Sequence, residues 1–168
     1  TLTDITSYTD YVEKLNALFE DDTVEEIEEV EIQYPVYTEE DFWDEVYMNE
    51  TDYQILVNLL KNKKNIILQG APGVGKTFAA KRLAYSMMGV KDSSRVTMVQ
   101  FHQSYSYEDF IMGFRPASTG FELKKGPFYS FCKKAETDIE NDYFFIIDEI
   151  NRGNLSKIFG ELFMLIEN

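Results

Sequence analysis

The chain has 168 residues, of which 44% are hydrophobic and 15% aromatic, and this composition excludes a disordered protein. No apolar run approaches the roughly 18 residues that span a membrane, and the polar N-terminus shows no secretory leader. The single cysteine, Cys132, excludes an intramolecular disulfide and a Cys-rich metal site. These features favour the cytoplasm.

The net charge of −14 is unevenly distributed. Residues 1–60 hold 18 of the 30 acidic residues and one of the 16 basic residues, a net charge of −17, whereas residues 61–168 carry +3. The acidic first part repels phosphate backbones, so the chain has no obvious DNA-binding face of its own. Residues 20–31 contain eight acidic residues and predict a solvated linker or an exposed helix; an acidic arm for a basic partner is the alternative.

The first two elements in chain order are short helices. Residues 9–19 have apolar side chains at helical spacing after Thr9, a plausible N-cap. A second helix is expected to start near Thr38. It carries three side chains inward: Phe42, Trp43 and Val46.

A third helix is expected to begin with Thr51 as its N-cap. Gln54 follows three residues later, which is the pattern of a capping box. Residues 61–64 include three lysines, and cations suit a helix C-terminus. The apolar stripe of this helix consists of Tyr53, Leu56, Leu59 and Leu60.

Beyond residue 64 the pattern alternates between strands and helices, which predicts an α/β fold with a parallel sheet. Residues 65–69 are a short apolar run ending at glycine, typical of a buried parallel strand. Residues 121–128 predict a hairpin, with 125–127 as its turn or as the exit into the next helix. The other expected elements are a helix at 76–88, a strand at 96–101, a helical turn at 107–112, a helix ending near 139, a strand at 143–147 and a helix at 154–166.

The clearest motif lies between the strand at 65–69 and the helix at 76–88. It has the pattern of a P-loop, in which backbone N–H groups wrap phosphates and a helix N-terminus adds partial positive charge. Lys76 would reach the β- and γ-phosphates, and the Thr77 hydroxyl would bind Mg²⁺. A glycine-rich turn without a ligand is the less favoured alternative. The expected nucleotide-binding residues are Gly70, Ala71, Pro72, Gly73, Val74, Gly75, Lys76, Thr77 and Phe78.

The second half of the site is expected at the end of the strand at 143–147. Asp148 would hold Mg²⁺ together with Thr77, and Glu149 would act as the general base on the attacking water. Asn151 could sit near the γ-phosphate, and Arg152 could face a neighbouring subunit. An ordinary loop in which Asn154 caps the last helix is an equally good interpretation of these last residues.

Three other features favour structural roles. His102 is the only histidine and more readily makes a local hydrogen bond than a metal site. Cys132 is most simply a small buried residue. A group of aromatic residues is expected in the core rather than as a nucleic-acid stacking platform: Phe101, Tyr105, Tyr107, Phe110 and Phe114.

Residues 70–167 resemble the AAA+ motor domain of McrB-type proteins, the GTP-dependent motor subunits of modified-cytosine restriction systems. The P-loop is shared with many families, and the specific part lies in the segments 99–111, 113–116, 148–152 and 154–157. The resemblance covers roughly residues 50–168. The hairpin at 121–128 is similar to that of the wider helix-2-insert group, which includes the MoxR ATPases.

This resemblance implies a hexameric ring with nucleotide bound between subunits. It implies GTP as the fuel, with ATP as the alternative, and Mg²⁺ as the cofactor. It implies a nuclease partner of the McrC type and DNA contacts made through regions outside this chain. It also implies that residues 43–47 lie near the nucleotide base, and that the loop 70–77, Asp148 and Glu149 have the roles given above.

The resulting expectation is a P-loop NTPase core of the AAA+ type, at residues 38–168, preceded by an acidic helical segment at 1–37. The chain departs from the family pattern in three features that are absent. These are the sensor strand with its Met-Asn-Thr-Ala-Asp segment, the trans-acting arginines and the helical lid. A sheet without that central strand is expected to leave unpaired backbone groups and exposed apolar surface.

Two alternatives to a GTP-driven restriction motor stay open. One is a MoxR-like ATPase that remodels proteins. The other, for these 168 residues alone, is a nucleotide-binding module that does not hydrolyse its ligand, because the sensor and finger residues are absent.

Overall fold

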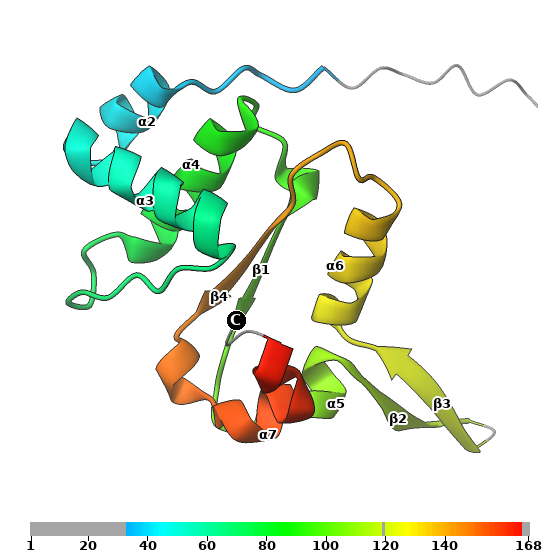
Figure 1. Cartoon of the computed structure of the whole chain (residues 1–168). Helices are drawn as coiled ribbons and strands as arrows, with labels where there is room; N and C mark the ends of the chain where they lie inside the picture. Colours follow the sequence, from blue (N-terminus) through cyan, green and yellow to red (C-terminus); the bar gives the residue numbers. More distant parts are fainter. Residues whose placement is uncertain (1–32, 119, 166–168) are drawn as a thin grey trace, which may run out of the picture. The chain divides into compact units, whose positions relative to one another are not determined.

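The computed structural model describes residues 33–118 and 120–165 (Figure 1). The expected helix at 9–19 and the acidic segment at 20–31 lie outside the described residues. Within the described part, no helix has the length and apolar character needed to cross a membrane.

Three helices lie together on one side of the central strands: α2 (Glu39–Glu45), α3 (Glu50–Lys63) and α4 (Lys76–Met88) (Figure 1). The prediction for α2 is confirmed, because the Thr38 hydroxyl accepts from the Asp41 amide and the Asp41 carboxylate accepts from the Thr38 amide. The N-terminus predicted for α3 is wrong by two residues. Asn49, not Thr51, is its N-cap, since the Asn49 side chain accepts from the Asp52 amide.

These three helices share a core of apolar and aromatic side chains. Phe42 and Tyr53 are almost fully buried, with ring centroids 4.8 Å apart. The Tyr53 hydroxyl donates to Ser86 Oγ of α4 at 3.1 Å, which satisfies a polar group inside the cluster. The buried members of this first core are Tyr37, Phe42, Val46, Tyr53, Val57, Leu83 and Tyr85.

The central sheet consists of two parallel strands, β1 (Val96–Gln100) and β4 (Phe144–Asp148), with Val96 opposite Phe144. Side chains alternate between the two faces of a strand, so Val96 packs on the first core and Val99 on a second one. A short 3-10 turn, η2 (Ser93–Arg95), leads into β1. The two strands bring Gln100 and Asp148 to the same sheet edge.

The strand predicted at residues 65–69 does not form in the structure. The segment makes no ladder with any described strand, and Ile67 is 80% exposed. A strand exists only where a neighbour takes up its backbone groups, and β1 and β4 pair with each other instead. Residues 65–69 therefore stay outside the described ladders, and Ile67 is left as exposed apolar surface.

The second side of the sheet carries a short helix, a hairpin and a longer helix. These are α5 (Tyr107–Phe110), strands β2 (Met112–Ala117) and β3 (Gly120–Lys125), and α6 (Pro127–Glu136). The hairpin therefore begins earlier than predicted, and residues 125–127 are the exit into α6 rather than its turn. Its apolar residues face solvent, since Phe114 is 69% and Phe121 75% exposed.

The last elements are a 3-10 turn η3 (Ile150–Arg152), α7 (Leu155–Phe159) and a 3-10 helix η4 (Gly160–Leu165), where one helix was predicted. The second core is largely aromatic, and the fully buried Phe110 ring contacts Phe128, Phe145 and Phe159. Its buried members are Phe101, Phe110, Ile111, Ile158 and Phe159.

Two burial predictions on this side of the sheet are wrong. Phe114 belongs to the exposed face of the hairpin, because β2 pairs only with β3 and nothing described covers its outer face. Cys132 is exposed on α6, where Phe128 and Phe131 face the Phe145 ring instead.

Candidate functional site

The loop predicted to bind phosphates connects residue 69 to α4. Gly73 and Gly75 have φ angles of 80° and 81°, a left-handed conformation that side chains with a Cβ disfavour. Gly75 is also the N-cap of α4, and no side chain caps this helix end. Residues 70–75 are exposed. The first amides of α4 therefore lie at an uncapped N-terminus that solvent can reach, which suits an anion.

Lys76 folds back over this loop. Its Nζ donates to the carbonyl oxygens of Gly70 at 2.9 Å and of Ala71 at 2.8 Å. The ammonium group thus holds the start of the loop against the first turn of α4. These carbonyls are neutral acceptors, so an anion at the same place would be a stronger partner for the cation.

Thr77 links the loop to the end of the sheet. Its hydroxyl donates to Asp148 Oδ1 at 2.9 Å, over 71 residues of sequence. Asp148 is the last residue of β4, and the Phe101 amide donates to its backbone carbonyl. The structure therefore brings together the two residues that the sequence proposed as a shared oxygen site.

Glu149 follows at the turn after β4 and has a φ angle of 51°, which is uncommon for a residue with a side chain. Arg152 Nε donates to Glu149 Oε2 at 2.9 Å. Asn151 lies between them in η3 and is exposed. Asn154 caps α7 by accepting from the Lys157 amide, so the capping interpretation is confirmed for this residue.

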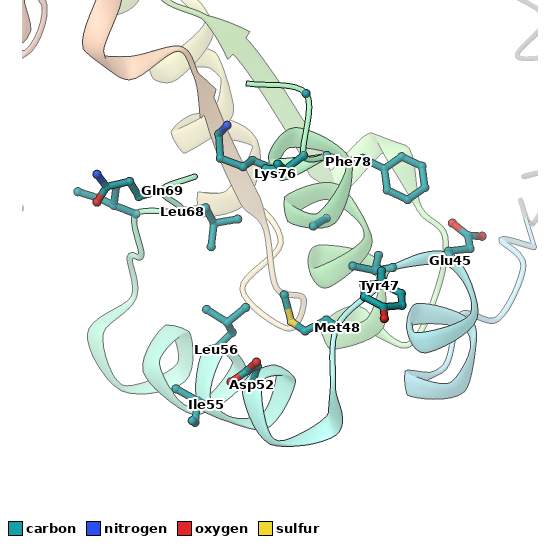
Figure 2. Close-up of a pocket in the computed structure, with 16 residues that line it drawn as sticks. Glu45, Tyr47, Met48, Asp52, Ile55, Leu56, Leu68, Gln69, Lys76 and Phe78 are labelled. Carbon is teal, nitrogen blue, oxygen red and sulfur yellow. The ribbon is translucent and has the colours of Figure 1, made fainter. Parts of the chain in front are cut away.

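A cavity of about 720 Å³ adjoins the loop (Figure 2). Residues 73–76 and Phe78 line it, whereas residues 70–72 and Thr77 do not. Figure 2 shows Glu45, Tyr47 and Phe78 on one side and Leu68 and Gln69 on the other. Sequence reasoning missed the wall formed by α3, whose contribution comes from Asp52, Ile55 and Leu56.

The end of α2 lines one side of the cavity, and the family resemblance implied that this region lies near the nucleotide base. Glu45, Val46 and Tyr47 line it, but Trp43 packs against the first core instead. Tyr47 is fully exposed, so its ring is available to a ligand. A mixture of exposed apolar surface and a few polar groups is typical of small-molecule sites.

Glu45, which lines this cavity, forms ion pairs with two basic side chains. Arg82 Nε donates to its Oε2 at 2.6 Å, and Lys91 Nζ lies 3.5 Å from Oε1. The hydrogen bond from Arg82 is the main cause that lowers the pKa of Glu45. Arg82 also stacks 3.9 Å from the centre of the Phe78 ring, which fixes one wall of the cavity.

The donor set at the end of β4 suits a hard cation. Thr77 and Asp148 offer a hydroxyl and a carboxylate oxygen in contact, which are the ligand types that Mg²⁺ takes alongside water and phosphate. No cluster of three or more His, Cys, Asp or Glu side chains occurs among the described residues, so nothing there resembles an all-protein metal cage. His102 instead packs its ring edge-on against Tyr105, with centroids 5.2 Å apart.

Comparisons with known proteins give a consistent result. The family described as "AAA domain (dynein-related subfamily)" matches residues 65–168. The chain is 58% identical over 132 residues to the "Type IV methyl-directed restriction enzyme EcoKMcrB subunit" of Escherichia coli (strain K12), covering 79% of this chain and 29% of that protein. It is 30% identical over 131 residues to the "Type II restriction enzyme BsuMI component YdiS" of Bacillus subtilis (strain 168), covering 62% of this chain and 38% of that protein. The chain thus spans less than two fifths of the curated relatives it matches.

Proposed function

Because the chain belongs to the AAA domain family, in its dynein-related subfamily, and is of the McrB type, we propose that it carries the nucleotide-binding half of an NTPase motor. The proposed ligand is a nucleoside triphosphate with Mg²⁺. Its phosphates would lie on residues 70–78 and its base in the cavity beside Tyr47.

The observation that carries this proposal is the hydrogen bond between Thr77 and Asp148. A glycine-rich turn without a ligand needs no carboxylate from a distant strand at its first helical turn. Here the strand end and the helix start meet at 2.9 Å, beside a lysine that already reaches across the loop. This is the arrangement that Mg²⁺-dependent phosphate binding requires.

Each residue then has a defined task. Lys76 would move its ammonium group from the Gly70 and Ala71 carbonyls to the β- and γ-phosphates. Thr77 and Asp148 would hold Mg²⁺, which when bound neutralises charge on the phosphates. Glu149 would orient a water and accept its proton, as the water oxygen bonds to the γ-phosphorus and the bond to the bridging oxygen breaks. Asn151 is proposed near the γ-phosphate.

For the whole protein we propose GTP-driven restriction of modified DNA in the cytoplasm. The support comes from the similarity to a protein whose name describes a methyl-directed restriction enzyme subunit, and from the second relative, a restriction enzyme component. We extend the proposal to a ring of subunits, a nuclease partner of the McrC type, and DNA contacts outside this chain. The segment 1–37 is proposed as an acidic helical or linker segment, and 38–168 as the N-terminal portion of the AAA+ nucleotide-binding domain.

The decisive experiment measures phosphate release by the full-length protein with GTP and with ATP. Each nucleotide is tested alone, with the nuclease partner, with modified DNA, and with unfolded protein. Turnover with GTP that rises with the partner and modified DNA supports restriction. Equal or better turnover with ATP contradicts the GTP assignment, and stimulation by unfolded protein instead of DNA favours the MoxR-like alternative.

A further inference from the structure

We propose that Arg152 is a positioning residue that holds the Glu149 carboxylate in a resting orientation until the nucleotide's phosphates draw the guanidinium group away. The proposal rests on the proposed function of Glu149 as general base. It assigns to Arg152 a restraining role on basal turnover within its own subunit.

The backbone after β4 places these two side chains together. Residues Ile150–Arg152 form a 3-10 turn with Glu149 as its N-cap, and the Arg152 amide donates to the Glu149 carbonyl at 2.9 Å. This hydrogen bond closes the turn and brings residues 149 and 152 together, with the Glu149 backbone in the left-handed region. The guanidinium group therefore lies over the carboxylate, with Nε 2.9 Å from Oε2.

The turn is held at both ends, so the side chains rather than the backbone are free to rearrange. On one end β4 is bonded to β1 through Asp148. On the other end Gly153 has no room for a side chain, because an added Cβ would lie 2.6 Å from Ile158 Cδ1 and 3.0 Å from Phe101 Cδ2. Both neighbours are buried in the second core.

The Arg152 side chain is the more exposed member of the pair. It is 63% exposed, compared with 13% for Arg95 and 20% for Arg82, which also bind carboxylates. Among the described residues, the Glu149 carboxylate is the one partner of its guanidinium group. The ion pair can therefore open without disturbing either core.

The chemistry of the site supplies a competitor for the guanidinium group. Glu149 directly follows Asp148, which contacts Thr77 at the start of α4. A triphosphate bound there brings more negative charge than one carboxylate and offers bidentate acceptors, which arginine prefers. Binding of the nucleotide would then weaken the contact and free the Glu149 oxygen in part of the bound molecules. In the remaining bound molecules the contact would still restrain Glu149 and so slow basal turnover.

The test replaces Arg152 with Gln in the full-length protein and measures kcat and KM for GTP without any partner. An exposed ion pair restrains its members weakly, so we expect kcat to rise about two- to fivefold while KM stays unchanged. Arg152→Lys, which keeps the charge, should stay near wild type. Lys133→Gln breaks another exposed pair of the same i, i+3 spacing, with Glu136 on α6, and should leave kcat unchanged. An unchanged or lowered kcat for Arg152→Gln overturns the proposal.

A second readout does not depend on turnover. In protein labelled with ¹⁵N-arginine, the Nε–H resonance of Arg152 should move in Glu149→Ala and, in the wild type, on adding Mg²⁺ with a non-hydrolysable GTP analogue. Lys133→Gln should not move it. A resonance that is the same in Glu149→Ala and wild type shows that the ion pair does not form, even in an active enzyme. Absence of turnover with every nucleotide refutes the proposed function instead, and the resonance still decides whether the pair exists.

Discussion

Replacing Lys76 with Ala is expected to weaken nucleotide binding about 100-fold. In the free protein its ammonium group donates to the Gly70 and Ala71 carbonyls at 2.9 and 2.8 Å, and these donors are the ones that would turn to the phosphates. A hydrogen bond to a charged group contributes about 1.5–3 kcal/mol, so losing one or two of them would cost about 1.5–6 kcal/mol. Release of the two carbonyls offsets part of this, which places the loss near the lower end, at about 2.7 kcal/mol or two powers of ten in Kd.

The measurement is a titration of the protein with a fluorescent GTP analogue at saturating Mg²⁺. Lys81→Ala is the matched control, because Lys81 lies on the same helix and, among the described residues, its ammonium group is placed only over the Tyr85 ring, 5.9 Å from the centroid. Thermal unfolding of both variants verifies that α4 is intact. Wild-type affinity in Lys76→Ala, with Lys81→Ala also unchanged, would refute the assignment of residues 70–77 as a phosphate-binding loop.

Three further predictions follow from described contacts. Glu149→Gln should bind GTP normally but lower single-turnover hydrolysis at least 100-fold, because an amide cannot take up the proton; normal turnover would remove Glu149 as the base. Gly126→Ala should lower the free energy of unfolding by about 3 kcal/mol in urea titrations, since its Cβ would lie 2.3 Å from the Phe110 carbonyl oxygen; a loss below about 1 kcal/mol contradicts this contact. Burial raises the pKa of Asp92, but hydrogen bonds from Ser94 and Arg95 outweigh it and lower the pKa. Asp92 therefore stabilises the fold above the unfolded-state pKa of about 4, and this is lost as the pH falls through the lower folded value. Asp92→Asn should flatten that part of a stability–pH curve, and a curve parallel to wild type would show that Asp92 does not contribute.

Elements whose limits are set by local chemistry could be predicted from the sequence. Helix α4 begins at Lys76 and ends at Met88 as expected, because left-handed Gly75 and Gly89 bound it on both sides. The residue at the start of α3 could not be chosen from the sequence. Asn49 and Thr51 are both good N-caps, and the contact between Asn49 and Asp52 decides in favour of the earlier one.

Features that depend on a distant neighbour could not be predicted. The apolar run at 65–69 has the sequence pattern of a buried strand. A strand also needs a neighbouring strand to pair with, and the sequence of the run does not reveal whether one is present. The exposure of Phe114 could not be predicted either. It depends on which element covers the outer face of β2, and the residues around Phe114 in the sequence do not indicate that. In the candidate site, the loop and Asp148 were identifiable from motifs, whereas the α3 wall and the Arg152 contact arise only in three dimensions.

The hydrogen bond between Thr77 and Asp148 has a consequence for how affinity should be measured. This bond uses the hydroxyl proton and one acceptor site of Asp148 Oδ1, and it leaves lone pairs on the Thr77 oxygen that a metal could take. Mg²⁺ arriving with a nucleotide could therefore bind the Thr77 oxygen while the hydroxyl proton stays on the carboxylate, so this hydrogen bond need not break. The ratio of the affinities measured with and without Mg²⁺ would then report the strength of the metal contacts alone, because the internal hydrogen bond is kept in both cases.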